Sequence, residues 1–395
     1  MSNSRKEITV GFLWHSLGSG NLGVGALTES NIAIVRSAAE EMNLRVNFLI
    51  LGTSDKSIPD LAKELNQAGH TLECHRVRIF RKSYRDLVKR CDFVLDIGEG
   101  DSFADIYGFE RFFYHWIGKN IVCSLNRPLI LSPQTIGPFD GAISRMMAKQ
   151  IMWRCKKIFS RDSLSSDYLK SLGIISNTEE AIDVAFCLPY FQPDIKEEIT
   201  KVGINVSGLL FNGGYTGNNQ FGLTVDYAAT VRQLIEYFLN DCSAEVHLIP
   251  HVLESNMQTE DDYAACEQLL NEYPQIILAP RFSRPSMAKS YIAQMDFFVG
   301  ARMHACIGAY SACVPVIPMA YSRKFNGLFG TLGYTAIADC KKDDANSILE
   351  KIKHGFAHRL ELRNMVVESK KIIDQRISLY QSELKETIKH VVQSR

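Results

Sequence analysis

The feature that most constrains the fold of this chain is a repeated alternation of short apolar runs with longer segments of helical periodicity. Short, nearly continuous apolar runs are typical of strands buried on both faces of a sheet. The helical segments between them supply the crossover connections that parallel strands require. The pattern therefore predicts an α/β protein built on parallel sheets.

In the first half we expect strands at Ile8–Trp14, Arg45–Leu51, Phe93–Ile97, Pro128–Ser132 and Lys157–Ser160, and helices at Val24–Met42, Ser57–Ala68, Ser144–Arg154 and Ser163–Leu172. Regular periodicity is then lost around Pro189 and Pro193. A second series follows, with strands at Lys201–Val206, Glu245–Pro250, Gln275–Leu278, Phe297–Val299 and Val316–Met319, and helices at Asp226–Leu239, Asp261–Glu272, Ser286–Met295 and Met303–Cys313.

We accordingly predict two Rossmann-like domains, at residues 1–195 and 196–342, whose parallel sheets face each other across a cleft. Residues 343–395 are predicted to be helical and to pack back on the first domain. The alternative for the basic, amphipathic part, Lys351–Arg395, is contact with a membrane.

Composition excludes several classes of protein. Lys+Arg and Asp+Glu both number 44, so no bulk charge favours nucleic acid. The 10 cysteines form no C-x-x-C pair, which argues against a zinc ribbon or a disulfide framework. The first residues lack the pattern of a signal peptide, and polar residues interrupt the most apolar window, Met295–Tyr321. We expect a cytoplasmic protein, with at most peripheral contact at the inner face of a membrane.

Ligands of open parallel sheets bind beyond the carboxyl ends of strands, and five strand-end loops are unusual. "HSLGSGNLGVG" (His15–Gly25) is either an anion-binding turn before a helix or an ordinary flexible turn. "SPQTIGPF" (Ser132–Phe139) is rigid and serves either as scaffold or as contact. "DIGEGDSFADIYG" (Asp96–Gly108) is rich in acids, which suit sugar hydroxyls, a divalent metal or simple capping of a turn.

The remaining two loops carry cations. Arg161 in "FSRDSLS" either pairs with a neighbouring acid or binds a carboxylate or phosphate. Arg302 and His304 in "GARMHAC" lie between a buried strand and a helix start, where an anion is favoured. Lys324 in "YSRK" follows the next strand. Together these residues predict a small, multiply anionic donor and a hydroxylated acceptor.

The segments "GARMHACIGAYSACVPVIPMAYSRKFNGL", "SPQTIGPF", "SRDSLSSDYL" and "DIGEGDSFADIYG" resemble the polysaccharide pyruvyl transferase family over residues 8–335. The resemblance implies a fold similar to B-type glycosyltransferases. It also implies transfer of enolpyruvyl from phosphoenolpyruvate to two hydroxyls of one sugar, giving a cyclic pyruvate ketal and phosphate. The family's Asn-x-Gly-Asp is here Asn21-Leu22-Gly23-Val24, and Val24 cannot supply a carboxylate.

By this resemblance, phosphoenolpyruvate is bound by Arg161, Arg302, His304 and Lys324. His304 is also the expected general acid. Asp101 or Asp105 would be the catalytic base. The first domain, residues 1–195, is the expected acceptor side, and the second, residues 196–342, the donor side. The expected acceptor contacts are Glu99, Asp101, Asp105 and Tyr107. No metal or other cofactor is expected. The implied acceptor is a galactose- or mannose-type sugar in an exopolysaccharide, a capsular polysaccharide or a lipid-linked precursor.

Two other interpretations remain open at this stage. A B-type glycosyltransferase would also clamp phosphates with basic residues, but would be stabilised by nucleotide sugars rather than by phosphoenolpyruvate. A non-catalytic anion-binding protein would bind the donor without releasing phosphate. The sequence does not indicate the oligomeric state.

Overall fold

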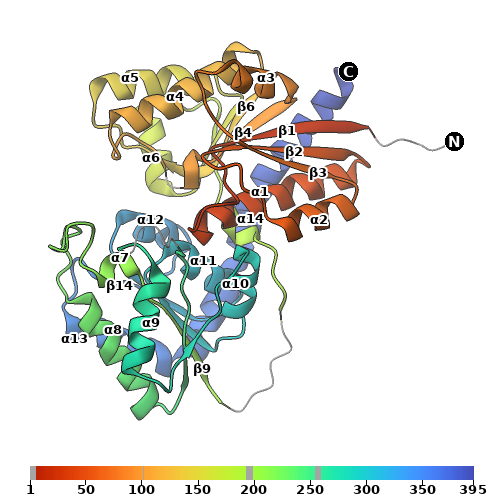
Figure 1. The fold of residues 1–395 in the computed structure, drawn as a ribbon. Helices are drawn as coiled ribbons and strands as arrows, with labels where there is room; N and C mark the ends of the chain where they lie inside the picture. Colours follow the sequence, from red (N-terminus) through yellow and green to blue (C-terminus); the bar gives the residue numbers. More distant parts are fainter. Residues whose placement is uncertain (1–5, 101, 193–198, 254–258) are drawn as a thin grey trace. The chain divides into compact units, whose positions relative to one another are not determined.

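The computed structural model describes residues 6–100, 102–192, 199–253 and 259–395 (Figure 1). Contacts divide the chain into two compact units. The first contains the residues up to Ser19, Leu27–Cys187 and Ile373–Arg395, and the second contains Gly20–Ala26 and Leu188–Ile372. The units are thus interleaved along the chain, whereas the predicted segments 1–195, 196–342 and 343–395 are consecutive. The end of the last segment belongs to the first unit.

The first unit is built on a parallel sheet of strand order β3-β2-β1-β4-β6-β7-β8, with β5 paired to β6. Its strands are β1 (Glu7–Leu13), β2 (Arg45–Gly52), β3 (Thr71–Arg76), β4 (Phe93–Asp96), β5 (Ser102–Phe103), β6 (Leu129–Ile136), β7 (Lys157–Ser160) and β8 (Thr178–Glu180). Its helices include α2 (Pro59–Gln67), α3 (Lys82–Arg90), α4 (Phe109–Ser124), α5 (Ala142–Met152) and α6 (Ser163–Ser171), with short turns η1 (Gly98–Gly100) and η2 (Val184–Cys187).

Helices cover both faces of this sheet: α1 (Leu22–Glu41) and α2 lie on one side, and α4 and α5 on the other (Figure 1). The central strands are therefore apolar on both faces, and every residue of β4 is buried. The first residues of α1 cluster with the second unit, and the helix continues into the first.

The second unit repeats the design with strand order β11-β10-β9-β12-β13-β14, again parallel. Its strands are β9 (Lys201–Asn205), β10 (Glu245–Leu248), β11 (Ile277–Leu278), β12 (Phe297–Gly300), β13 (Val316–Ala320) and β14 (Ala338–Asp339). Its helices are α7 (Gly208–Phe211), α8 (Tyr227–Glu236) with the continuing turn η3 (Tyr237–Asp241), α9 (Asp262–Glu272), α10 (Pro285–Ile292), α11 (Met303–Ser311), α12 (Arg323–Thr331) and α13 (Ala345–Ala357).

The last helix, α14 (Arg359–Gln393), begins in the second unit and ends in the first. Two parallel-sheet α/β units followed by C-terminal helices confirm the predicted fold class. In both sheets the strand order reverses beside the first strand of the unit, between β1 and β4 and between β9 and β12. Such a reversal opens a crevice at the carboxyl ends of the strands, which is where a ligand site is expected.

Candidate functional site

The reversal point of the second sheet gathers polar side chains from three strand ends. Asn205 ends β9, His251 follows β10, and Arg302 follows β12. The backbone N–H of Arg302 donates to Asn205 Oδ1 at 2.8 Å, and Asn205 Nδ2 donates to the Ile249 carbonyl at 2.9 Å. These hydrogen bonds fix the position at which Arg302 leaves the strand.

Arg302 is held by a carboxylate that sequence patterns did not indicate. Its Nη2 and Nε donate to Asp262 Oδ1 at 2.7 and 3.1 Å, and Nη2 also donates to the Glu260 carbonyl at 3.0 Å. The Arg302 side chain is 13% exposed and that of Asp262 is fully buried. Burial alone would lower the pKa of Arg302, but the Asp262 carboxylate and the adjacent Tyr321 hydroxyl outweigh it and raise that pKa. Arg302 therefore stays charged, with its charge balanced by Asp262.

Asp262 is the first residue of α9 and organises the surrounding loops. Its carboxylate accepts backbone hydrogen bonds from Gly208, His251 and Val252 at 2.8, 3.1 and 3.0 Å. The same carboxylate thus holds three backbone amides and the Arg302 guanidinium in fixed positions. The ion pair is thus part of the frame of the site.

His304 lies in the first turn of α11 and packs against the start of α1. A Cβ built on Gly23 would lie 2.5 Å from His304 Nδ1, so this position admits only glycine without displacing the ring. The Gly23 N–H donates to Asn21 Oδ1 at 2.9 Å, which caps α1. The glycine of the N-terminal loop therefore serves to bring α1 onto the histidine.

His251 lies near His304 and Arg302, and the sequence did not indicate it as a site residue. It is 4% exposed, and the positive charges of His304 and Arg302 act on it. Burial, reinforced by those charges, lowers the pKa of His251 to about 3. The ring is consequently neutral throughout the physiological range of pH.

Lys324 lies in the first turn of α12, three residues beyond Tyr321. Burial lowers the pKa of Lys324 to about 8. Tyr321 packs edge-on against Phe221, with ring centroids 5.5 Å apart, and its pKa is raised by burial although Arg302 opposes this. A lysine whose pKa is close to neutral is typical of functional sites as well as of buried charges.

Arg161, at the end of β7 in the first unit, is 2% exposed. Its Nη1 forms an ion pair with buried Asp183 at 2.7 Å and its Nε donates to Thr135 Oγ1 at 3.0 Å. Its Nη2 has no hydrogen-bond partner among the described residues. Of the two expectations for this arginine, pairing with an acid is what the structure shows, and one donor nitrogen is left over.

The acidic loop after β4 is held in a left-handed backbone. Gly98, Glu99 and Gly100 have φ values of 60°, 62° and 82°, and the value for Glu99 is uncommon for a residue with a side chain. Glu99 Oε2 lies 3.4 Å from both Arg111 Nη2 and His115 Nε2. Burial would raise the pKa of Glu99, but these two contacts outweigh it and lower the pKa.

The other acids of this loop differ in their surroundings. Asp101 lies outside the described residues. Asp105 accepts backbone hydrogen bonds from Asp140 and Gly141, both at 3.0 Å, just before α5. Burial would raise the pKa of Asp105, but these hydrogen bonds lower it. Tyr107 is 48% exposed, and the Arg111 guanidinium lies 4.8 Å from its ring centroid.

A buried polar cluster underlies the reversal point of the first sheet. Lys119 Nζ lies 3.0 Å from Asp96 Oδ2, and both side chains are fully buried. Nearby, burial lowers the pKa of His15 to about 4, and Asn31 Nδ2 lies 3.1 Å from His15 Nε2. Asp96 was expected in the acidic loop, whereas no sequence pattern indicated Lys119 or His15 as its buried neighbour.

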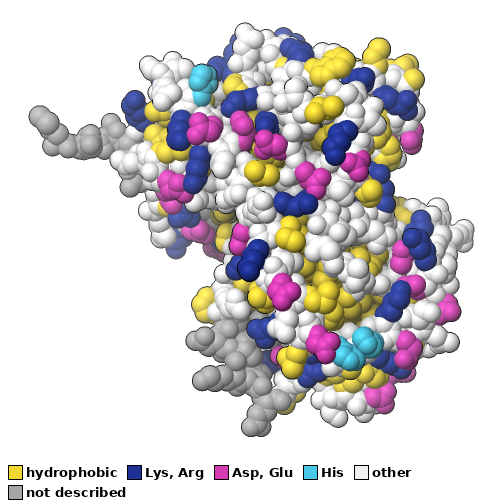
Figure 2. Space-filling model, turned by 180° about the vertical axis from the view of Figure 1, so that it is seen from behind, with side chains coloured by type: hydrophobic (Ala, Val, Ile, Leu, Met, Phe, Trp, Pro, Cys, Tyr) yellow, Lys and Arg dark blue, Asp and Glu magenta, His cyan; other side chains and the backbone are white. Residues whose placement is uncertain are grey.

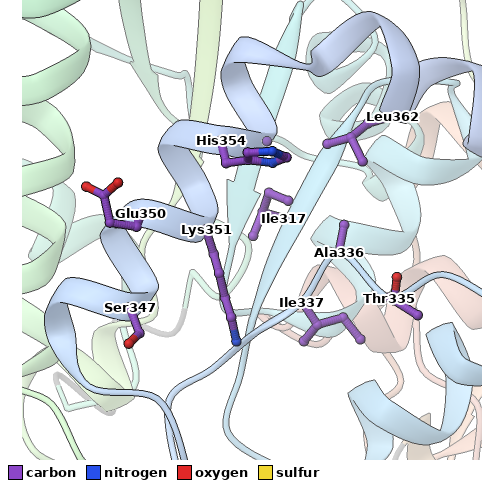
Figure 3. A pocket seen from close by; sticks show the side chains of 10 residues that line it. Ile317, Thr335, Ala336, Ile337, Ser347, Glu350, Lys351, His354 and Leu362 are labelled. Atoms are coloured by element: carbon purple, nitrogen blue, oxygen red, sulfur yellow. The ribbon is translucent and has the colours of Figure 1, made fainter.

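A pocket of about 480 Å³ opens elsewhere in the second unit, between α13 and the segment before β14 (Figure 3). Its lining is mostly apolar at the sheet and polar along α13; the residues are Ile317, Thr335, Ala336, Ile337, Ser347, Glu350, Lys351, His354, Gly355 and Leu362. Lys351 at its edge is paired with Asp343 at 2.5 Å. None of the predicted site residues lines it.

Metal sites and membrane-spanning helices were also sought in the parts of the chain that the structure describes. No cluster of three or more His, Cys, Asp or Glu side chains in those parts is arranged to hold a metal ion. Within the same residues, no helix is both long and apolar enough to cross a membrane. On the face shown in Figure 2, basic and acidic side chains are interspersed, in keeping with equal totals of the two.

The candidate site of the second unit thus carries Arg302 and His304 at the start of α11, Tyr321 beside Arg302, and Lys324 in the first turn of α12. The family model of the polysaccharide pyruvyl transferases matches residues 43–323, most of the chain. The chain belongs to the polysaccharide pyruvyl transferase family. The amylovoran biosynthesis protein AmsJ of Erwinia amylovora is 22% identical over 331 residues, covering 76% of this chain and 74% of that protein. These matches confirm the resemblance found in the sequence.

Solved structures with similar folds support the architecture of this family member. A putative UDP-N-acetylglucosamine 2-epimerase from Listeria monocytogenes superposes with a TM-score of 0.58 at 9% identity, covering 91% of each chain. Sucrose-phosphate synthase from Thermosynechococcus elongatus gives 0.57 at 10% identity, covering 99% of this chain and 100% of that one. At such low identity the likeness shows the fold alone, which is that of B-type glycosyltransferases and sugar epimerases.

Proposed function

We propose that this protein transfers the enolpyruvyl group of phosphoenolpyruvate to two hydroxyls of one sugar in a polysaccharide or its lipid-linked precursor. The product is a cyclic pyruvate ketal. The observation that carries the proposal is the position of Arg302 and His304 at the reversal point of the second sheet, in a chain of this family. Such a crevice suits a small anion of high charge.

The reaction balances without an oxidant or reductant. One proton adds to the methylene carbon of phosphoenolpyruvate, which becomes the methyl group, while the first sugar oxygen bonds to the central carbon. The bond from that carbon to the phosphate oxygen breaks, and the second sugar oxygen takes its place. The two hydroxyls lose two protons: one balances the methyl group and the other leaves on hydrogen phosphate.

In this mechanism His304 donates the proton to the methylene carbon, since histidine titrates near neutral pH. Arg302 orients an anionic group of the donor. Because Asp262 already balances its charge, further positive charge for the departing phosphate comes from Lys324. The charge of Arg161 is likewise balanced, by Asp183, so we propose that it contributes its remaining Nη2 donor. No metal or other cofactor enters the proposed steps.

A carboxylate of the acidic loop receives the hydroxyl proton, with Asp101 and Asp105 as the candidates. The two amide hydrogen bonds to Asp105 disfavour proton uptake there. The proposed contacts to the acceptor sugar are Glu99, Asp101, Asp105 and Tyr107. We propose a galactose- or mannose-type acceptor in an exopolysaccharide, which the similarity to a protein of amylovoran biosynthesis supports.

The test is release of phosphate from phosphoenolpyruvate in the presence of galactosides, mannosides and lipid-linked oligosaccharides. Wild type should release phosphate only with an acceptor, and His304→Gln and Arg302→Lys should lower kcat/KM at least about 100-fold. Asp101→Asn beside Asp105→Asn identifies the base. Arg232→Lys, which alters a more exposed arginine–carboxylate pair with Glu272, is the matched control and should be neutral.

Two outcomes would contradict the proposal. Thermal stabilisation by nucleotide sugars but not by phosphoenolpyruvate would indicate a glycosyltransferase. Binding of phosphoenolpyruvate with no release for any acceptor would indicate a protein that binds the anion without turning it over.

A further inference from the structure

His251 has an unusual combination of a fixed backbone and an unused ring. Its N–H donates to Asp262 Oδ2 at 3.1 Å, and its carbonyl accepts from the Leu22 N–H at 3.0 Å. Yet neither Nδ1 nor Nε2 has a hydrogen-bond partner among the described residues, although the residue is 4% exposed. The large majority of buried polar side-chain atoms have such a partner, so this histidine calls for a specific explanation.

A purely structural role does not account for this ring. Leaving a buried polar group unsatisfied destabilises the folded state, and an apolar residue of similar size would avoid that cost. The ring also lies close enough to His304 and Arg302 for their positive charges to act on it. A neutral imidazole still carries one N–H donor and one acceptor nitrogen.

The surroundings of His251 favour a negatively charged ligand. Asn21 pairs with Val252 in an antiparallel bridge, and the Leu253 N–H donates to the Gly20 carbonyl at 2.8 Å. These contacts bring the start of α1, a helix of 20 residues, against the segment that carries His251. The positive end of the helix dipole, Arg302 and His304 thus act in the same region.

We propose that His251 is a donor-binding residue, whose ring N–H donates a hydrogen bond to an anionic oxygen of phosphoenolpyruvate beside Arg302 and His304. This inference rests on the proposed function for the identity of the ligand. The oxygen belongs either to the carboxylate or to the phosphate. Binding of the donor then supplies the partner that the buried ring lacks.

The contrast with His247 provides a matched control. His247 lies on β10, and its Nδ1 and Nε2 lie 2.8 Å from Tyr291 Oη and Glu245 Oε1. It is likewise buried, at 5% exposed, but its hydrogen bonds lie within the fold. Removing this ring should affect stability, whereas removing the ring of His251 should affect binding.

The experiment measures binding of phosphoenolpyruvate, inorganic phosphate and pyruvate by calorimetry, together with the Tm of each unliganded protein. His251→Leu should raise the Kd for phosphoenolpyruvate roughly 10- to 100-fold, the range expected for a lost hydrogen bond to a charged group, with no fall in Tm. His247→Leu should lower Tm and leave that Kd within about 2-fold. His251→Asn or His251→Gln should restore part of the affinity, depending on which ring nitrogen donates.

The two small anions identify the contact. If His251→Leu weakens phosphate but not pyruvate, the ring faces the phosphate, and the reverse pattern assigns the carboxylate; either supports the inference. An unchanged Kd for all three ligands overturns it. So does a lost affinity that falls together with Tm and is restored by neither amide. If wild type binds phosphate but not phosphoenolpyruvate, the proposed function fails, while loss of phosphate binding in His251→Leu would still support the anion site.

Discussion

At the scale of single residues, the arginine of the site in the second unit carries a charge that a buried carboxylate compensates. Arg302 faces the carboxylate of Asp262, which in turn orders three backbone amides. The ion pair with Asp262 weakens the attraction of Arg302 for an anionic ligand. It also fixes the position of the guanidinium before a ligand binds. Preorganised charges need not be reordered during the reaction, which is why a balanced pair can still serve binding and catalysis.

The pair should be strongly coupled in stability. Asp262→Ala leaves a buried guanidinium without its carboxylate and three amides without their acceptor, and we expect it to lower the free energy of unfolding by about 3–5 kcal/mol. Arg302→Ala should cost a similar amount, and the double variant less than the sum. Urea unfolding of the four proteins measures this coupling. Additive effects would mean that the two side chains do not depend on each other.

Lys324 is predicted to lower the free energy of unfolding at neutral pH while strengthening the binding of phosphoenolpyruvate. Because burial lowers its pKa to about 8, the unfolded chain binds more protons than the folded one between pH 8 and the ordinary lysine pKa of about 10.4. Its contribution to stability therefore rises with pH over that window. At pH 7 the buried charge is a cost, so Lys324→Met should raise the free energy of unfolding by about 1 kcal/mol or more.

The same titration should appear in donor binding. Above pH 8 the wild-type protein loses the Lys324 charge, so its Kd for phosphoenolpyruvate should rise between pH 7 and 9, with the sharpest change near pH 8. Lys324→Met should bind weakly throughout and lack that change. Calorimetry at several pH values measures both. A variant with the wild-type pH profile would show that another group is responsible.

The site residues fall into two classes according to what the sequence could reveal. Arg302 and His304 are two positions apart and follow an apolar run, so local pattern was enough to indicate them. Asp262 and His251 lie at least 40 positions from Arg302, and only the parallel strand order brings the three together. A helix-start aspartate and a single histidine after a strand have no local feature that distinguishes them from ordinary caps and core residues.

At the scale of secondary-structure elements, the start of α1 shows how a glycine-rich loop is used. Gly23 allows the first turn of this helix to lie against His304, and Asn21 caps the turn. The loop was expected to be either an anion-binding turn or a flexible connection. Its described contacts include the histidine ring and residues 251–253, which makes the helix start part of the frame around the site.

Gly23→Ala should therefore separate activity from stability. Alanine normally stabilises a helix relative to glycine by up to about 1 kcal/mol, but here its Cβ would lie 2.5 Å from His304 Nδ1 and must displace the ring. We expect kcat for phosphate release to fall at least about 10-fold with little change in Tm. Gly330→Ala in α12, where a Cβ meets nothing within 4 Å, is the control and should be fully active. Equal activity of both variants would contradict this role for Gly23.

The elements that sequence analysis recovered and missed differ in their physical character. The buried central strands β1, β4, β9 and β12 were predicted within two residues at each end, because strands covered on both faces are continuous in apolarity. The edge strand β3 was missed, because its residues are only partly buried and mostly polar. α4 was also missed, because its buried His115 and Lys119 interrupt the apolar face. His115 contacts Glu99, and Lys119 pairs with Asp96.

At the scale of the whole molecule, neither unit is a continuous segment of sequence. The first unit is completed by Ile373–Arg395 and the second by Gly20–Ala26. The sequence indicated a boundary where periodicity is lost, but periodicity within one segment carries no information about which sheet a distant segment joins. The end of α14 is therefore best regarded as a structural part of the first unit.

The packing of this helix end explains why the first unit should depend on it. One face of this helix end is fully buried, at the helical spacing of Tyr380, Leu384 and Ile388. The Tyr380 hydroxyl donates to Asn31 Oδ1 at 2.8 Å and lies 2.8 Å from Ser132 Oγ. Through Asn31 it connects to the buried ring of His15. The neighbouring Leu379 lies on the exposed side of the same helix and is 42% exposed.

Deletion of residues 373–395 should consequently unfold the first unit more readily than the second. Hydrogen exchange should show lost protection in β1, β4 and β6, with protection largely retained in β9 and β12, because each unit has its own apolar core. Tyr380→Phe should be a milder form, costing about 1–3 kcal/mol through Asn31 and Ser132, whereas Leu379→Ala should be within about 0.5 kcal/mol of wild type. If β9 and β12 lost protection to the same extent as β1, the two units would unfold as one cooperative body, and the helix end would support the whole molecule rather than the first unit.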